Sequence, residues 1–332
     1  MSVLTVPEVL HHARISGVGA HRPERVVPNS EIVNAIDSSD EWIRERSGIA
    51  SRHRAAPDVS VVDMSEQASR RAMSQAGITA EDIGAVLVAT VTHPYQTPGA
   101  APELAARLGS AAAAFDISAA CAGYCHGISV ANDMVRVGTA EHVLVVGVEK
   151  LSDFTDPHDR GSAFIFGDGA GAAVVSRSET PGIGPTVWGS DGDQRRLIAQ
   201  RDSWNEMRED RSLPWAAIVM EGPSVFRWAV WSMAKEAQRA LDAAGVRADE
   251  LAAFIPHQAN VRIIDQMAKA LGLPPEVPIA RDIVTTANTS AASVPLAMER
   301  MLREGEVPSG GLALQIGFGA GLVWAAQVVT LP

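Results

Sequence analysis

Three residues whose side chains can together perform acyl transfer stand far apart in the 332-residue chain: Cys121, His257 and Asn288. A thiolate at Cys121 could attack a thioester and hold the acyl group covalently. His257 and Asn288 can both donate hydrogen bonds without carrying negative charge, which suits them to stabilise an oxyanion. The set predicts a cysteine-nucleophile enzyme with Cys121 as its acyl carrier.

Cys121 lies where a strand predicted over residues 111–118 meets a helix predicted over 121–138. The first-turn N–H groups and the dipole of a helix favour negative charge, so they would stabilise a thiolate and could also hold an oxyanion. The alternative is a buried structural cysteine, which is the interpretation we favour for Cys125, one turn further along. Two cysteines four residues apart on a helix do not easily form a disulfide, so we expect a reduced, cytoplasmic protein.

His257 and Asn288 would be placed by different elements. His257 ends an apolar strand over 252–256 and opens an amphipathic helix over 257–272, whereas Asn288 lies in a small, polar turn. Taken singly, each residue is more often structural, His257 at a strand end and Asn288 as a cap. The glycines of GFGAG, at 317–321, would allow a close approach of the backbone to a ligand.

Two internal matches suggest a duplicated chain. RAMSQAGITAEDIGAVLV at 71–88 matches 239–256 at six of eighteen positions, with an offset of 168 residues. Each copy reads as a helix end, a glycine C-cap at Gly77 or Gly245, a loop and an apolar strand. GDGAG at 167–171 also resembles GFGAG. The sequence therefore predicts two α/β halves with mixed sheets, over 1–180 and 181–332, unless both matches arose by chance.

Composition excludes several classes of function. The net charge of −11 argues against a broad nucleic-acid-binding surface. No apolar run is long enough for a transmembrane helix, and residues 1–17 lack the pattern of a secretory signal. Neither glycine motif fits a phosphate or dinucleotide loop, and no metal-ligand spacing is present, so we expect no metal.

Longer segments resemble β-ketoacyl-acyl-carrier-protein synthase III, the initiating condensing enzyme of type II fatty acid synthesis, and in particular its actinobacterial branch. They cover nearly the whole chain and comprise SSDEWIRERSGIASRH, DISAACAGYCHG, DRGSAFIFGDGAGAAVV, FIPHQANVRIID, ANTSAASVPLAMER and IGFGAGLVWAA. The resemblance implies the thiolase fold, with two duplicated halves in a five-layered α/β/α/β/α arrangement, and a homodimer. It also implies acyl-CoA and malonyl-acyl carrier protein as substrates, with no cofactor.

By this resemblance, Cys121 takes an acyl group from acyl-CoA, and His257 and Asn288 promote decarboxylation of malonyl-acyl carrier protein. The resulting carbanion attacks the acyl-enzyme to give a 3-oxoacyl product. The backbone N–H groups of Cys121 and Ala320 would form the oxyanion hole. The resemblance assigns further residues to coenzyme A (Trp42, Arg46, Arg160, Gly222 and Asn260), to the acyl pocket (Thr97 and Phe318) and to docking of the acidic carrier protein (Arg262 and Lys269).

Two departures from the family pattern carry expectations. Relatives commonly have glycine where this chain has Ala287, and if that position needs a positive φ, alanine would be strained and could shift Asn288. Thr97 stands where some relatives have phenylalanine, in a loop that would cross a dimer interface and close the partner's acyl pocket. The smaller side chain predicts acceptance of branched or longer primers, such as isobutyryl-CoA, beside acetyl-CoA.

Other functions remain open at this point. One is a polyketide-priming ketosynthase of the same fold and chemistry. Another is an acyltransferase without decarboxylation, which the presence of Asn288 disfavours. A 3-hydroxy-3-methylglutaryl-CoA synthase is disfavoured because no acidic residue stands out to deprotonate acetyl-CoA. A non-enzymatic binding module would require the Cys/His/Asn set to be coincidental.

Overall fold

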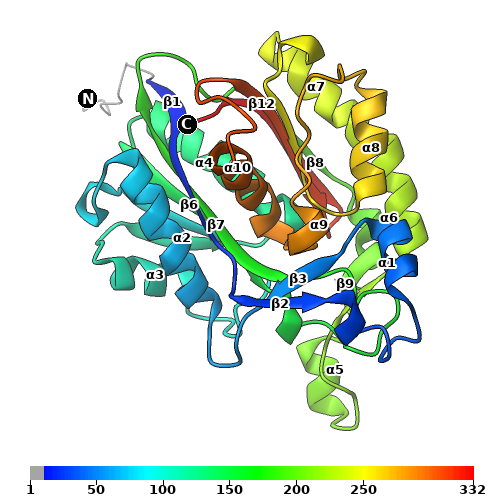
Figure 1. Cartoon of the computed structure of the whole chain (residues 1–332). Coiled ribbons are helices and arrows are strands. Elements are labelled where there is room, and N and C mark those ends of the chain that lie inside the picture. Colours follow the sequence, from blue (N-terminus) through cyan, green and yellow to red (C-terminus); the bar gives the residue numbers. More distant parts are fainter. Residues whose placement is uncertain (1–10) are drawn as a thin grey trace.

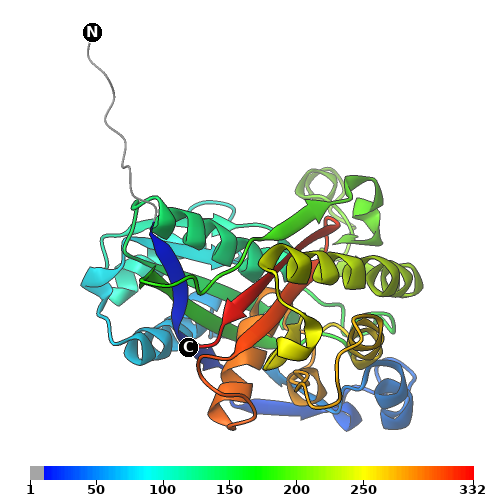
Figure 2. The same ribbon diagram turned by 90° about the horizontal axis from the view of Figure 1, so that it is seen from above.

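The computed structural model describes residues 11–332 and contains two mixed β-sheets with helices between and outside them (Figures 1 and 2). The first sheet has the order β1-β7-β6-β4-β5, in which β4 runs parallel to β5 and β6, and β7 runs antiparallel to β6 and β1. Its strands are β1 (His12–His21), β4 (Ala85–Ala89), β5 (Ala113–Ile117), β6 (His142–Lys150) and β7 (Asp168–Ser178).

The second sheet has the order β8-β13-β12-β11, in which β11 runs parallel to β12 and the other pairs are antiparallel. Its strands are β8 (Val187–Ser190), β11 (Ala253–Pro256), β12 (Leu312–Gly319) and β13 (Val323–Thr330). Two small antiparallel pairs complete the strands: β2 (Arg25–Pro28) with β3 (Ser51–Arg54), and β9 (Ile198–Gln200) with β10 (Ile218–Met220).

The helices form three layers around the two sheets, as Figure 1 shows. Helices α2 and α3 cover the outer face of the first sheet, α4 and α10 lie between the sheets, and α7 and α8 cover the second sheet. The helices are α1 (Asp40–Ser47), α2 (Val61–Ala76), α3 (Ala100–Leu108), α4 (Gly123–Arg136), α5 (Trp204–Glu209), α6 (Gly222–Trp228), α7 (Ala234–Ala244), α8 (Val261–Ala270), α9 (Ile283–Thr286) and α10 (Ser293–Arg303). This is the predicted five-layered arrangement.

The two sheets repeat one topology. Along the orders given above, β8, β13, β12 and β11 correspond to β1, β7, β6 and β4. The sequence match at offset 168 falls on equivalent elements, because α2 leads through a glycine cap to β4 as α7 does to β11. Gly77 and Gly245 end these helices in the left-handed region, with φ of 70° and 66°, as predicted.

The second sequence match does not reflect the repeat. GDGAG opens β7, whereas GFGAG ends β12, and these strands are not equivalent. The structural counterpart of Gly317 on β12 is Gly147 on β6, since both strands stand at the same place in the order and both glycines face a tight turn. GDGAG and GFGAG are therefore similar in sequence although they occupy different positions in the repeated topology.

The described part of the chain, from residue 11 onward, includes no helix long and apolar enough to cross a membrane. The expectation that residues 1–17 are not a secretory signal concerns a segment whose first ten residues lie outside the described ones.

Substitutions at the two glycine caps and at Gly19 test the backbone conformations and packing of this fold. Gly77→Ala and Gly245→Ala should each lower the free energy of unfolding by about 1–2 kcal/mol, because a left-handed alanine is strained although no atom lies near the added Cβ. Gly19→Ala should cost clearly more, because its Cβ would lie 2.5 Å from the backbone nitrogen of Ala72. Denaturant unfolding curves measure all three. Equal losses at Gly19 and at the caps would contradict this packing.

Candidate active site

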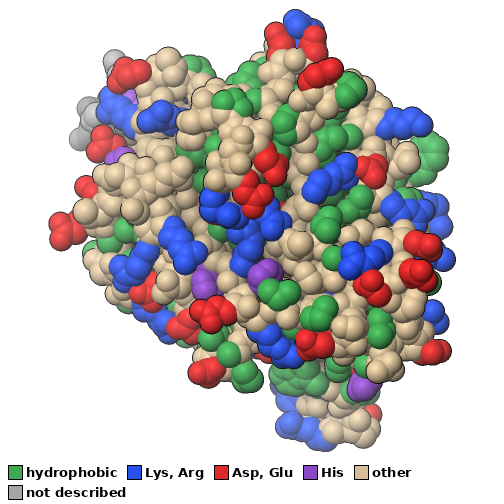
Figure 3. Space-filling view, in the orientation of Figure 1, with side chains coloured by type: hydrophobic (Ala, Val, Ile, Leu, Met, Phe, Trp, Pro, Cys, Tyr) green, Lys and Arg blue, Asp and Glu red, His purple; other side chains and the backbone are tan. Residues whose placement is uncertain are grey.

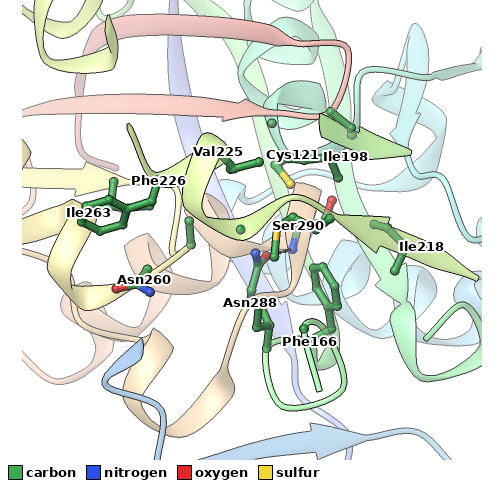
Figure 4. A pocket seen from close by; sticks show the side chains of 18 of the residues that line it. Cys121, Phe166, Ile198, Ile218, Val225, Phe226, Asn260, Ile263, Asn288 and Ser290 are labelled. Atoms are coloured by element: carbon green, nitrogen blue, oxygen red, sulfur yellow. Dashed lines mark hydrogen bonds between the residues drawn. The ribbon is translucent and has the colours of Figure 1, made fainter. Parts of the chain in front are cut away.

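The predicted catalytic residues meet in one cavity of about 750 Å³ between the two halves (Figure 4). Cys121, His257 and Asn288 all line it, although they come from three distant segments. Aliphatic and aromatic side chains form much of the remaining wall, among them Phe154, Phe166, Ile198, Ile218, Val225 and Trp228. An apolar cavity with a few convergent polar groups is the usual form of a small-molecule site.

Cys121 occupies the predicted strand–helix junction. It is the central residue of a 3₁₀ turn, Ala120–Ala122, which follows β5 and leads directly into α4. Ala120 begins this turn with a φ of 44°. Cys125, one turn into α4, is fully buried among core residues, as predicted for a structural cysteine.

The electrostatic setting of Cys121 has two opposing parts. The side chain is partly exposed to the cavity but withdrawn from bulk water, and this burial raises the pKa of Cys121 to about 12. The Ser290 side chain and the backbone groups of Cys121 and Ala320 act in the other direction and lower the pKa of Cys121. Burial outweighs these groups, so Cys121 is a thiol in the free protein at neutral pH.

GFGAG brings its backbone close to Cys121 because its glycines allow backbone contact. A Cβ on Gly319 would lie 2.8 Å from the sulfur of Cys121, and one on Gly317 would lie 2.9 Å from the Cys121 carbonyl oxygen. The close approach predicted from these glycines is therefore an approach to the nucleophile turn itself. Ala320, the next residue, also lines the cavity.

His257 is held as a neutral imidazole. It is 2% exposed at the end of β11, and burial lowers its pKa to about 3. Its Nδ1 lies 2.6 Å from the Ser293 hydroxyl, which also accepts from the Gln258 N–H. The hydroxyl hydrogen is thus free to be donated to Nδ1, which leaves the ring proton on Nε2. The Phe318 ring packs edge-on against the imidazole at 5.3 Å.

Asn288 is fixed through both its backbone and its side chain. Its N–H donates to the Ile165 carbonyl, and its own carbonyl accepts from Gly167. The side-chain Oδ1 accepts from the Ser290 N–H at 2.8 Å, so the Nδ2 group remains as a donor. Ala287 precedes it with φ 60° and ψ −162°, a combination almost confined to glycine. The strain expected at Ala287 is present, and the N–H and carbonyl groups of Asn288 are nonetheless both hydrogen-bonded.

The residues assigned to coenzyme A gather at one side of the same cavity. Trp42, on α1, lies beneath two guanidinium groups, with Arg160 at 5.1 Å and Arg46 at 5.7 Å from its ring centre. Asn260 caps α8 through Oδ1, and its Nδ2 donates to the Arg46 carbonyl, which ties α8 to α1. Gly222, the first residue of α6, also lines this part of the cavity.

Two predicted residues lie apart from the cavity. Thr97 is exposed in the loop before α3, and Lys269 is exposed near the end of α8. Arg262, on the first turn of α8, does line the cavity and packs its guanidinium over Phe226 at 5.0 Å. Among residues 11–332, no group of three or more His, Cys, Asp or Glu side chains could hold a metal ion.

Sequence reasoning missed three polar side chains, Ser290, Ser293 and Glu149. The two serines lie within the ANTSAASVP segment, where nothing in the spacing singles them out. Glu149 had a signal, because a carboxylate directly follows the apolar VLVVGV run of β6. It is fully buried behind Ser290 and does not line the cavity. An acidic residue is therefore near Cys121, but it does not reach a substrate α-carbon.

Two mixed-sheet halves around a cavity with Cys, His and Asn define an acyl-transferring condensing enzyme of the thiolase superfamily. The family model described as "3-Oxoacyl-[acyl-carrier-protein (ACP)] synthase III" matches residues 115–192, and its "C terminal" counterpart matches 241–331. The chain therefore belongs to the 3-oxoacyl-[acyl-carrier-protein] synthase III family.

Relatives match almost end to end. The β-ketoacyl-[acyl-carrier-protein] synthase III of Streptomyces glaucescens is 60% identical, with 97% of each chain covered. The mycobacterial enzyme of the same name from Mycobacterium marinum is 52% identical, over 95% of this chain and 94% of that one. Among solved structures, the priming β-ketosynthase of the R1128 polyketide pathway has a TM-score of 0.97 and 48% identity, covering 99% of this chain and 98% of that one. The synthase III of Aquifex aeolicus has a TM-score of 0.89 and 36% identity, over 96% and 99%.

Ala287 offers a direct test of backbone strain beside Asn288. Ala287→Gly should raise the free energy of unfolding by about 1–3 kcal/mol, because it removes a backbone conformation unfavourable to alanine. Its rate of condensation should not fall, because Asn288 is held by hydrogen bonds that the change leaves intact. Denaturant unfolding and steady-state assays measure both. Unchanged or reduced stability would contradict the strain.

Proposed function

We propose that this protein catalyses decarboxylative condensation of an acyl-CoA primer with malonyl-acyl carrier protein, giving 3-oxoacyl-acyl carrier protein and initiating type II fatty acid synthesis. The observation that carries the proposal is the convergence of Cys121, His257 and Asn288 in one cavity. The family membership and the names of the relatives support it.

In the first half-reaction, the Cys121 sulfur attacks the thioester carbon of acyl-CoA. Negative charge develops on the carbonyl oxygen, and the backbone N–H groups of Cys121 and Ala320 would stabilise it. Coenzyme A leaves, and the acyl group remains on sulfur. The pre-set donors require no reorganisation when the charge appears, which is the main source of their effect.

In the second half-reaction, His257 and Asn288 receive the malonyl thioester. Loss of carbon dioxide leaves an enolate, whose oxygen needs donors that carry no negative charge. The Nε2–H of the neutral His257 and the Nδ2–H of Asn288 both meet this need. The enolate carbon then attacks the acyl-Cys121 thioester, forms the new carbon–carbon bond and expels the Cys121 thiolate.

Coenzyme A would enter past Trp42, with its adenine between Trp42 and Arg160 and its phosphates near Arg46. A purine can stack on both an indole ring and a guanidinium plane. Because Arg160 lies only 5.1 Å from the Trp42 ring, it has to move outward to admit the base. Gly222 and Asn260 would then line the path of the pantetheine arm.

The carrier protein would dock on α8. Arg262 and Lys269 are exposed and seven residues apart, so they share a face of this helix, as an acidic partner requires. Elsewhere on the face shown in Figure 3, basic and acidic side chains are interspersed. Because the net charge of the protein is −11, an acidic partner would be attracted by these basic side chains of α8 and not by the protein as a whole.

A cytoplasmic homodimer would complete the acyl pocket. β5 is an edge strand of the first sheet, and Phe115 on it is 44% exposed. The loop with Thr97 is tied to this strand, because Asp116 accepts from the N–H groups of Ala100 and Ala101 at the start of α3. Pairing of two β5 strands would thus present Thr97 to the neighbouring protomer.

Two alternatives differ in the second half-reaction or in the pathway. A polyketide-priming ketosynthase would perform the same chemistry, and the similarity to the R1128 priming enzyme favours it specifically. A non-decarboxylating acyltransferase would leave the donors of His257 and Asn288 unexplained. Identifying the carrier protein that is used separates the first alternative from fatty acid initiation.

Intact-mass analysis tests the central claim. Incubation with a panel of acyl-CoAs should add one acyl mass to the wild type and none to Cys121→Ala. Asn288→Ala should still be acylated, whereas its condensation rate should fall by about 10²–10³-fold, because one oxyanion donor is lost. Absence of acylation by every acyl-CoA would overturn the proposed function. Full condensation by Asn288→Ala would overturn the assigned role of Asn288.

Primer choice can be tested at Thr97. Competition between isobutyryl-CoA and acetyl-CoA should show acceptance of both by the wild type. Thr97→Phe should reduce use of isobutyryl-CoA about tenfold or more, because lost volume is felt most by the branched primer. Gln96→Phe adds equal bulk at the neighbouring position and serves as the control. A strict acetyl preference in the wild type would contradict the prediction.

A further inference from the structure

The buried carboxylate of Glu149 has no part in the reaction as described so far. It stands near the end of β6 and is fully buried, yet four hydrogen-bond donors converge on it from its surroundings. The Thr90, Thr92 and Ser290 hydroxyls donate to it at 3.2, 2.6 and 3.2 Å, and the Val91 N–H donates to both oxygens at 3.1 and 3.3 Å. Burying a carboxylate is costly, so a site built around one calls for a reason beyond packing.

Ser290 connects this carboxylate to the nucleophile. Its hydroxyl donates to Oε1 of Glu149 at 3.2 Å, and the Ser290 side chain lowers the pKa of Cys121. Figure 4 shows Ser290 beside Cys121 at the cavity wall. Glu149 is fully buried and does not line the cavity. Ser290 therefore stands next to both the thiol and a carboxylate that no substrate touches.

The first half-reaction needs a path for the thiol proton. Cys121 starts as a thiol, and a thiol that attacks a carbonyl must lose its proton. His257 is a poor acceptor, because burial lowers its pKa to about 3. Glu149 is better matched, because burial raises its pKa to about 7 while the four donors hold this pKa below the value of a fully desolvated carboxyl group. The two groups also disfavour being ionised at the same time, because the negative charge of Glu149 raises the pKa of Cys121.

We infer that Glu149 and Ser290 form a proton relay that takes the Cys121 proton during acylation and returns it after condensation. As the sulfur–carbon bond forms, the S–H proton passes to Oγ of Ser290, and the Ser290 proton passes to Oε1 of Glu149. The thioester bond to coenzyme A breaks, and coenzyme A leaves as a thiolate that takes a proton from water. Glu149 then stays neutral while the acyl group is on sulfur.

The same path returns the proton to Cys121 in the second half-reaction. Condensation breaks the acyl–sulfur bond and leaves a Cys121 thiolate, which regains its proton from Glu149 through Ser290. No other acid is needed, and the free enzyme is restored. A neutral Glu149 at this stage also avoids placing a second negative charge near the enolate. This inference rests on the proposed function, because it concerns the proton of the proposed nucleophile.

Measuring the two half-reactions separately distinguishes a proton relay from a purely structural role of Glu149. Glu149→Gln keeps the size of the side chain but cannot take a proton, so acylation by isobutyryl-CoA or acetyl-CoA should slow about 100-fold, within the usual range for loss of a general base. Transfer from isolated acyl-enzyme to malonyl-acyl carrier protein should stay within about threefold of wild type, because Cys121 leaves as a thiolate and its proton returns only after the carbon–carbon bond has formed. Time-resolved intact-mass measurements follow both steps.

Three further variants sharpen this comparison. Ser290→Ala should show the same pattern, since it breaks the path but keeps the backbone N–H that holds Asn288. Glu149→Asp should recover part of the acylation rate. Asp168→Asn is the matched control, because Asp168 is equally buried on the neighbouring strand β7 but hydrogen-bonds to Ser152 and Ala55 instead. It should acylate within about threefold of wild type.

The outcomes are distinct. Acylation of Glu149→Gln or Ser290→Ala at the wild-type rate would overturn the relay, and so would an equal loss in both half-reactions. If the wild type itself is not acylated, the proposed function fails and the relay fails with it. If the wild type is acylated and Glu149→Gln is acylated at the same rate, the proposed function stands and only the relay is overturned.

Discussion

The site depends on contact between two tight turns, one from each copy of the repeated topology. The turn Ala120–Ala122 leads from β5 into α4, and the turn Ser290–Ala292 leads into α10. Both begin at a positive φ, 44° at Ala120 and 49° at Ser290, and each packs against a glycine of the opposite sheet. A Cβ on Gly317 would meet the first turn and one on Gly147 the second. Any side chain at these glycines would push a turn away from the centre, so the packing of the two sheets sets the distance between nucleophile and donors.

This arrangement explains why the chemistry is divided between the two copies. Cys121 is the centre of one turn, and the equivalent centre of the other turn is Ala291, which is buried and inert. The second copy instead contributes the residues around its turn. Asn288 precedes it, Ser290 begins it, and Ser293 follows it at the start of α10, where it orients His257. In the proposed mechanism, one turn supplies the nucleophile, and the other supplies hydrogen-bond donors and the proton path. Two copies of one fold thus hold different chemistry at equivalent positions.

Sequence reasoning reached two α/β halves because periodicity and glycine caps are local signals, whereas the five-layered arrangement was implied by the family resemblance. The match of α2 and β4 to α7 and β11 survives in the sequence since both copies need the same cap and the same buried strand. The match between GDGAG and GFGAG was misleading as a sign of the repeat, because glycines occur wherever two backbone segments come into contact, whatever their place in the fold. Cys121, His257 and Asn288 could be named from residue type and family resemblance. The ionisation of Cys121 could not, because a helix N-terminus is visible in a sequence whereas the burial that raises the pKa to about 12 depends on both halves.

Burial also decides how the polar groups divide their work. His257 and Cys121 are both driven toward their neutral forms, so neither holds a charge before substrate arrives. A neutral imidazole is the form that can donate from Nε2, and a neutral thiol is protected from unproductive reaction, so both are useful states. The cost is that the thiol proton needs a destination. Glu149 is the buried group whose pKa of about 7 lies between theirs, and it is kept out of the cavity by Ser290. A carboxylate exposed in the cavity would repel the malonyl group, whereas one behind a hydroxyl can accept a proton without meeting the substrate.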